Sequence, residues 1–178
     1  MSLDHLWAGW RSNYVTSFEA RADAPAPSPE PAVRETEAEC VFCAILASDE
    51  PDEVRHVLWT GRHTAALLNA YPYCPGHVMV LPIRHVRDLD EMRPEESAEM
   101  SGAVRDAVAA VKAAYRPEGM NIGLNLGRAA GAGIPAHLHV HIVPRWIGDT
   151  NFMTAVANVR VLPEALGDSW AKLRAAWT

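Results

Sequence analysis

Three histidines at alternating positions, His137, His139 and His141, are the residues of this chain best placed to do chemistry. A period of two between polar and apolar residues is typical of a half-buried β-strand. All three imidazoles should therefore project from one face, while Leu138 and Val140 point into a core. The outer two Cα atoms lie about 13 Å apart on such a strand. One metal ion, with imidazole ligands at about 2.0–2.1 Å, cannot easily bind all three, so the spacing argues against a metal-transport or metal-catalytic protein and predicts different roles for neighbouring histidines.

A glycine-rich loop, residues 127–136, directly precedes the histidine strand and contains Gly131 and Gly133. Because glycine has no side chain, consecutive backbone N–H groups of such a loop can close around an anion. A plain flexible turn is the alternative explanation for such a loop. Its place directly before three alternating histidines favours the anion site.

The run from His137 to Val143 resembles the signature of the histidine triad (HIT) family of nucleotide hydrolases and transferases, in which histidine alternates with apolar residues. The similarity covers about residues 40–152. Further matching segments are Leu67–Asn69, Pro75–Pro82, Gly123–Gly127 and Ala130–Met153. The last of these resembles bacterial diadenosine tetraphosphate phosphorylases and hydrolases. The resemblance implies a purine nucleotide or dinucleoside polyphosphate as substrate, and a homodimer whose sheets join edge to edge and cover an exposed strand.

By this resemblance the central residue, His139, is the catalytic nucleophile and forms a covalent nucleotidyl-imidazole on the α-phosphate. An unperturbed imidazole has a pKa near 6.5 and is mostly neutral at pH 7, as a nucleophile must be. His141 is expected to bind phosphate oxygens or to assist proton movement at the leaving group. Water or inorganic phosphate then accepts the nucleotide, which predicts ping-pong kinetics.

The resemblance also assigns a set of nucleotide-binding residues, which besides His141 comprises Asn69, His77, Asn125, Gly131 and Gly133. Asn69 is placed like the residue that contacts the ribose, and an amide offers both a donor and an acceptor. A role in the turn that follows is the equally weighted alternative. Asn125 is placed like a phosphate-contacting asparagine, and His77 is expected to support the site from behind.

The pair Cys40 and Cys43 forms a Cys-x-x-Cys motif, which by itself fits a redox pair, two buried thiols or half of a metal site. No βαβ pattern surrounds it, which argues against a thioredoxin-like protein. In zinc-bearing HIT proteins and related galactose-1-phosphate uridylyltransferases, a histidine after the hairpin strand and the first triad histidine complete the site. The resemblance therefore implies His85 and His137 as further ligands of a structural zinc, a closed set of two thiolates and two imidazoles.

One departure from the family pattern concerns the leaving group. Relatives commonly carry Gln, Ser or Thr where this chain has Gly133 and Ile134, so a side-chain phosphate donor is missing. Arg128 is a possible substitute, although a solvated arginine is the simpler interpretation. Two alternative functions stay open: a nucleoside phosphoramidate hydrolase using the same nucleophile, and a non-catalytic nucleotide-binding regulatory module.

The composition is that of a globular protein, with 178 residues, 49% hydrophobic and 21% charged. The net charge of −6 argues against a nucleic-acid partner, which usually requires a basic stripe. No apolar run reaches the roughly 18 residues that span a bilayer, and the first residues lack the apolar stretch of a signal peptide. Three cysteines, two of them paired in one motif, fit a reducing compartment. We therefore expect a cytoplasmic protein without membrane contact.

The chain divides into an aromatic-rich N-terminal segment, a Pro/Ala-rich linker and a folded HIT-like domain, over residues 1–22, 23–39 and 40–178. Apolar residues three and four apart predict a long helix over 94–115, and Pro163 is expected to start a C-terminal helix. The predicted strands are 54–59, 64–69, 77–82, 120–126 and 137–144. Short turns between strands, with one long helix, predict an α+β fold with a five-stranded antiparallel meander sheet.

Overall fold

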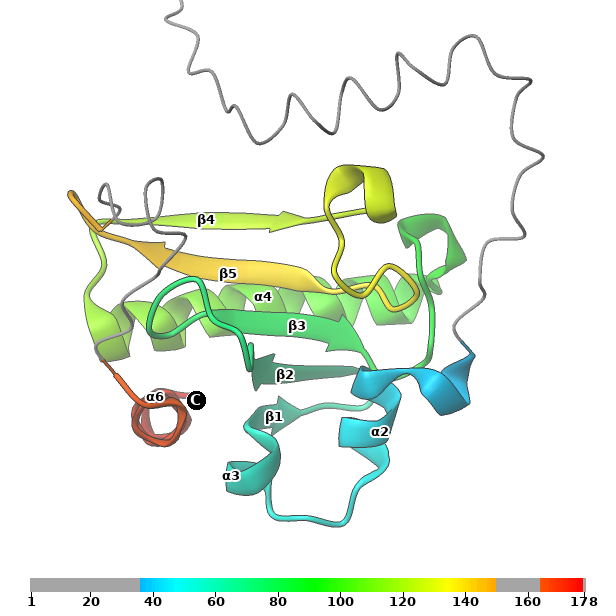
Figure 1. Ribbon diagram of the computed structural model, residues 1–178, viewed down its shortest axis with the longest axis horizontal. Coiled ribbons are helices and arrows are strands. Elements are labelled where there is room, and N and C mark those ends of the chain that lie inside the picture. The colour runs from blue at the N-terminus through cyan, green and yellow to red at the C-terminus, as the bar shows by residue number, and fades with distance from the viewer. Residues whose placement is uncertain (1–35, 150–163, 178) are drawn as a thin grey trace, which may run out of the picture. The chain divides into compact units, whose positions relative to one another are not determined.

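The computed structural model describes residues 36–149 and 164–177 (Figure 1). The predictions for the aromatic N-terminal segment, for the linker up to residue 35 and for Pro163 lie outside the described residues. Five antiparallel strands form one sheet in the order β1-β2-β3-β5-β4. The strands are β1 (Val57–Thr60), β2 (Thr64–Leu68), β3 (Val78–Pro82), β4 (Gly119–Leu124) and β5 (Val140–Arg145).

The helices lie on both faces of this sheet. They are α2 (Val41–Ala47), α3 (Asp52–Arg55), α4 (Pro94–Tyr115) and α6 (Leu166–Ala176), with 3-10 turns η1 (Glu37–Glu39), η2 (Leu89–Glu91) and η3 (Arg128–Ala130). The α+β class, the five antiparallel strands, the long helix and the C-terminal helix are as predicted. No helix in the described part of the chain is long and apolar enough to cross a membrane.

The strand order differs from a meander in sequence order, because β5 lies between β3 and β4. Both neighbours run antiparallel to β5, so β3 and β4 are parallel to each other. Parallel strands need a crossover connection, and α4 provides it by running along one face of the sheet (Figure 1). The crossover places the histidine strand in the interior of the sheet and leaves β4 at its edge.

Two strands begin three residues later than the sequence predicts. Val54, the expected start of the first strand, lies in helix α3, and His56 ends that helix in the left-handed conformation with φ 57°. The last strand starts at Val140 instead of His137, because residues 137–139 are not paired with β3. There Leu138 donates its N–H to the carbonyl oxygen of Val86 at 2.7 Å, in the segment beyond β3.

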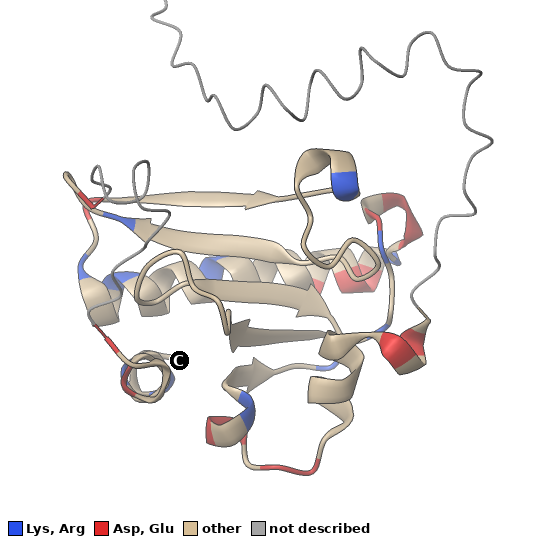
Figure 2. Cartoon of the chain, in the orientation of Figure 1, with Lys and Arg blue, Asp and Glu red and all other residues tan. Residues whose placement is uncertain are grey.

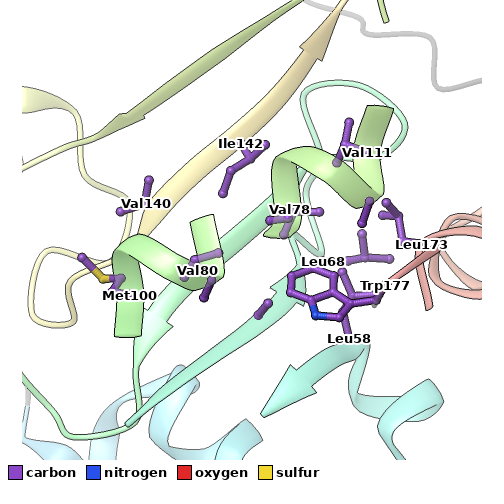
Figure 3. Packing of buried hydrophobic residues seen from close by; sticks show 14 of the residues in the cluster. Leu58, Leu68, Val78, Val80, Met100, Val111, Val140, Ile142, Leu173 and Trp177 are labelled. Carbon is purple, nitrogen blue, oxygen red and sulfur yellow. The ribbon is translucent and has the colours of Figure 1, made fainter. Parts of the chain in front are cut away.

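The main core lies between the sheet, α4 and α6 (Figure 3). Leu138, Val140 and Ile142 all point into it, as the alternation in the sequence predicts. A second cluster, which includes Phe42 and Met79, packs on the opposite face beneath α2. Since successive side chains of a strand alternate between faces, the histidines lie on the α2 face.

An ion pair fixes the segment after β3 to the start of α4. Two nitrogens of Arg84 donate to the carboxylate of Glu96 at 2.8 and 2.7 Å, and Glu96 also accepts the backbone N–H of Arg93 at 2.8 Å. The Glu96 side chain is only 3% exposed. The next residue in the chain is His85, so this pair anchors the segment that carries a predicted metal ligand.

This pair predicts a loss of stability in acid. The hydrogen bonds from Arg84 lower the pKa of Glu96 from 4.5 to about 2. Because the carboxyl pKa is lowered in the folded state, its stabilisation is fully present above about pH 4.5 and is lost as the pH falls toward about 2. We expect Glu96→Gln to remove about 1–3 kcal/mol of this pH-dependent free energy of unfolding. Urea unfolding between pH 5 and pH 2 measures it. The exposed neighbour Glu95→Gln is the control, and a pH profile of Glu96→Gln parallel to that of the wild type would contradict the assignment.

Candidate functional site

The three triad histidines form a cluster on the α2 face of the sheet, in which His137 and His139 are buried and His141 is partly buried. His137 is 1% exposed and His139 is 5% exposed. The rings of His139 and His141 lie 4.8 Å apart, centroid to centroid. The ring of Phe42, from α2, stands edge-on 5.5 Å from His137 and 5.1 Å from His139. This Phe42 contact could not be predicted from the sequence, because only the docking of α2 creates it.

The hydrogen bonding of His139 defines which nitrogen can react. Its Nδ1 lies 2.8 Å from the carbonyl oxygen of His137. A carbonyl oxygen only accepts, so Nδ1 carries the proton and Nε2 keeps the lone pair. Burial lowers the pKa of His139 below the ordinary imidazole value, which keeps the ring neutral. His139 is therefore held in the tautomer that a nucleophile attacking through Nε2 requires.

A chain of hydrogen bonds orients His141 from behind. The backbone N–H of Tyr73 donates to Nδ1 of His77 at 3.1 Å, so the proton of His77 lies on Nε2. That Nε2 donates to Nδ1 of His141 at 2.9 Å, which leaves the proton of His141 on its own Nε2. Burial lowers the pKa of His141 to about 4. The sequence analysis expects His77 to support the site, and the structure shows that its hydrogen-bond partner is His141.

The β2–β3 turn positions His77. Gly76 has φ 78°, and a Cβ there would lie 2.7 Å from the Tyr115 ring, so only glycine fits. Asn69 accepts the N–H of Tyr71 at 2.9 Å, and its Nδ2 lies 3.5 Å from Nδ1 of His77. The turn-forming role considered for Asn69 is thus present, beside a contact with the histidine chain.

The glycine-rich loop forms a compact turn before the triad. Gly127 and Gly131 adopt φ 76° and 90° around η3. The N–H of Gly131 donates to the carbonyl oxygen of Arg128 at 2.9 Å and closes the turn. The anion-binding role of Gly131 stays a prediction. Gly133 follows the turn, and its anion-binding role stays a prediction.

A cavity of about 410 Å³ opens on the histidine face over β4 and β5. Asn125 and His141 line one part of it, and Arg145 and Asp149 line another. Gly123 pairs with His141 across the two strands, and a Cβ at Gly123 would meet open space. The sequence indicated Asn125 and His141 as binding residues but gave no sign of the cavity that joins them to Arg145.

The four predicted metal ligands lie together at the other end of the histidine row. The ligand atoms of Cys40, Cys43, His85 and His137 all lie within 4.8 Å of one another. Nδ1 of His137 lies 3.3 Å from Sγ of Cys40, and Nδ1 of His85 lies 3.3 Å from Sγ of Cys43.

The chemistry of this cluster fits a zinc ion. Nε2 of His137 donates to the carbonyl oxygen of Pro82 at 2.8 Å, so Nδ1 presents its lone pair to the thiols. Without a cation, burial and then the hydrogen bond with Cys40 raise the pKa of the Cys43 thiol to about 12. A divalent ion reverses this balance, because it stabilises thiolates.

Comparison with known proteins gives consistent matches. Residues 51–146 match the HIT domain family. An AP-4-A phosphorylase of Mycobacterium tuberculosis is 39% identical over 175 residues, which is 98% of this chain and 85% of the relative. A bis(5'-nucleosyl)-tetraphosphatase (asymmetrical) of Schizosaccharomyces pombe is 36% identical over 89 residues, or 50% of this chain and 48% of that protein. A zinc-bound histidine triad family protein from Mycobacterium smegmatis superimposes with a TM-score of 0.64 at 31% identity, covering 80% of this chain and 95% of that one.

Proposed function

The chain belongs to the HIT domain family, and we propose that it cleaves nucleoside or dinucleoside polyphosphates at the α-phosphate through a covalent nucleotide on His139. The observation that carries this proposal is the bond from Nδ1 of His139 to the His137 carbonyl, which leaves Nε2 as the free nucleophile. The names of the relatives from M. tuberculosis and S. pombe support dinucleoside tetraphosphates as the substrate class.

The geometry supports a two-step displacement. Nε2 of His139 attacks the α-phosphorus, the bond to the bridging oxygen breaks, and the leaving phosphate departs with the electron pair. His141, with its proton on Nε2, donates a hydrogen bond to the phosphate oxygens or to the leaving oxygen. Water or inorganic phosphate then attacks the same phosphorus, and the P–N bond to His139 breaks. Asn125 contributes its amide at the phosphate.

Mass spectrometry tests the covalent step. We expect enzyme mixed rapidly with diadenosine tetraphosphate and quenched to carry an adenylate on the peptide that contains His139. Turnover with and without inorganic phosphate then separates phosphorolysis from hydrolysis. Turnover in which no adduct forms on this peptide, with kinetics that are not ping-pong, would contradict the mechanism.

We further propose that Cys40, Cys43, His85 and His137 hold a structural zinc. The convergence of two thiols and two imidazoles supports it, as does the likeness to a zinc-bound HIT protein. The ion would supply no bond-making chemistry, since a closed set of four protein ligands leaves no position for substrate. It would tie α2 to the chain just before His139. Such a thiol pair also fits a reducing cytoplasm.

The edge strand β4 supports a homodimer. Within residues 36–149 and 164–177, β4 pairs with a strand on one side only, and Ile122 and Leu126 are 50% and 37% exposed. Pairing of two β4 edges would cover the unpaired backbone groups and these apolar side chains. The molecular mass in solution tests this assembly.

A further inference from the structure

We propose that Tyr115, the last residue of α4, is a positioning residue of the catalytic site: its ring fixes the turn that carries His77, and His77 orients His141. The inference rests on the proposed function for the action of His141 at the phosphate. It predicts that the ring of Tyr115 affects the rate of nucleotide transfer and leaves the affinity for nucleotide unchanged.

The ring of Tyr115 lies against the backbone of the β2–β3 turn. A Cβ added at Gly76 would lie 2.7 Å from Cε2 and 2.9 Å from Cδ2 of this ring, so the ring fills the space beside the Gly76 backbone. Packing this close leaves the turn no room to move toward the end of α4. Because Gly76 directly precedes His77, the ring fixes the point from which the His77 side chain projects.

The contacts of His77 transmit this position to His141. His77 is fully buried, its N–H donates to the carbonyl oxygen of Cys74 at 3.3 Å, and its carbonyl oxygen accepts the N–H of Asn69 at 3.1 Å. Its ring lies between the N–H of Tyr73, at 3.1 Å, and Nδ1 of His141, at 2.9 Å. Hydrogen bonds weaken steeply when their geometry is lost. A shift of the turn would therefore release His141 from its orientation and its tautomer.

The hydroxyl of Tyr115 is anchored on the segment that begins α6. It donates to Oε1 of Glu164 at 2.5 Å, and the hydroxyl of Ser169 donates to the same oxygen at 2.6 Å. Glu164 lies just before α6, where Figure 2 shows an acidic residue in red, and Lys172 of this helix forms an ion pair with its carboxylate. Charge-assisted hydrogen bonds of this kind hold a carboxylate in one place. Tyr115 therefore joins α6 to the turn of His77.

The loop after β5 meets the same ring. The rings of Tyr115 and Trp146 stand edge-on, 6.4 Å apart at an angle of 71°. In the β2–β3 turn, the thiol of Cys74 donates to the carbonyl oxygen of Pro144 in β5 at 3.1 Å. Figure 1 shows this turn and the ends of α4 and β5 on one side of the molecule. The ring therefore fixes the turn relative to β5, the strand that carries His141.

The experiment compares two substitutions of Tyr115 with the same two at a matched position. Tyr115→Leu removes the ring from Gly76, whereas Tyr115→Phe keeps the ring and loses only the hydrogen bond to Glu164. Trp170→Leu and Trp170→Phe are the controls, because Trp170 of α6 is also partly buried against the main core and its Nε1 donates to the carbonyl oxygen of Val57 at 2.8 Å, at the β1 edge of the sheet. If Tyr115→Leu does not fold, Tyr115→Met, which keeps more volume without a ring, takes its place with the same expectations.

Nuclear magnetic resonance of the full-length protein with isotope-labelled histidine reports the bond between His77 and His141. The wild type should show a slowly exchanging proton on Nε2 of His77, because this ring is buried and donates to His141. Tyr115→Leu should abolish this resonance or raise its exchange rate with water at least about tenfold, since the turn then opens locally. Tyr115→Phe and both Trp170 variants should keep it. A wild-type resonance of His77 in Tyr115→Leu would overturn the inference.

Single-turnover kinetics with diadenosine tetraphosphate measures the consequence for nucleotide transfer. Tyr115→Leu should lower the rate of adenylate transfer to His139 by about tenfold to 100-fold, the scale expected when a reacting group is misplaced by about 1 Å, and should change the affinity for AMP by no more than about threefold. Tyr115→Phe should recover the rate to within about threefold of the wild type, and Trp170→Leu should stay within the same limit.

A transfer rate unchanged by Tyr115→Leu, or an equal loss in Trp170→Leu, would overturn the inference. A failure of the proposed function gives a different result. If the wild type transfers no nucleotide, that function fails, and the proton exchange of His77 still decides whether Tyr115 positions the histidine pair.

Discussion

Replacement of His139 by alanine is expected to lower kcat for diadenosine tetraphosphate by at least about 10⁴-fold, the scale seen when a nucleophile is removed. The affinity for nucleotide should change by no more than about threefold, because the ring contributes a reacting nitrogen and not a major binding contact. The hydrogen bond from His77 that orients His141 does not involve this side chain.

Single-turnover kinetics and calorimetric titration with AMP measure the two effects separately. His139→Asn keeps a polar side chain at this buried position and should show the same kinetic loss if alanine proves to be destabilising. His63→Ala, a histidine outside the cluster, is the control and should retain full turnover. A His139→Ala enzyme that still formed product at the wild-type rate would exclude His139 as the nucleophile and return the regulatory-module alternative to consideration.

Loss of the proposed zinc is expected to have the largest effect on stability. The double variant Cys40→Ala/Cys43→Ala should bind no zinc, whereas the wild type should carry about one ion per chain. Structural zinc contributes of the order of 10 kcal/mol to the folding of small domains, so a loss of at least about 3 kcal/mol in a larger core is a conservative expectation. Turnover should also fall, because His137 directly precedes the strand that carries the catalytic ring.

Metal analysis and thermal unfolding in the presence and absence of a chelator measure this prediction. Cys74→Ala is the matched control, since the third thiol donates to the carbonyl oxygen of Pro144 at 3.1 Å, away from the four-residue cluster. Wild-type protein that binds no zinc from a supplemented buffer, and whose melting temperature is unchanged by chelator, would refute the assignment.

Local patterns in the sequence determined which face each residue occupies. The alternation from His137 to Ile142 predicted that the apolar members point into a core, and the structure places Leu138, Val140 and Ile142 there. The bounds of α4 agree with the predicted helix over 94–115, since proline favours the first turn and the apolar spacing fixes the buried stripe. These features depend on neighbours within a few residues, which the sequence shows directly.

Apart from the four metal ligands, whose convergence the family resemblance predicted, only the tertiary structure decided which distant residues meet. The insertion of β5 between β3 and β4, the bond from His77 to His141 and the cavity between Asn125 and Arg145 all depend on the α4 crossover. Strand pairing over long separations leaves no period in the sequence, and the direction of a hydrogen bond follows from the positions of both partners. For the same reason α3 replaced the predicted start of the first strand, because short apolar segments fit helix and strand equally well until packing selects one.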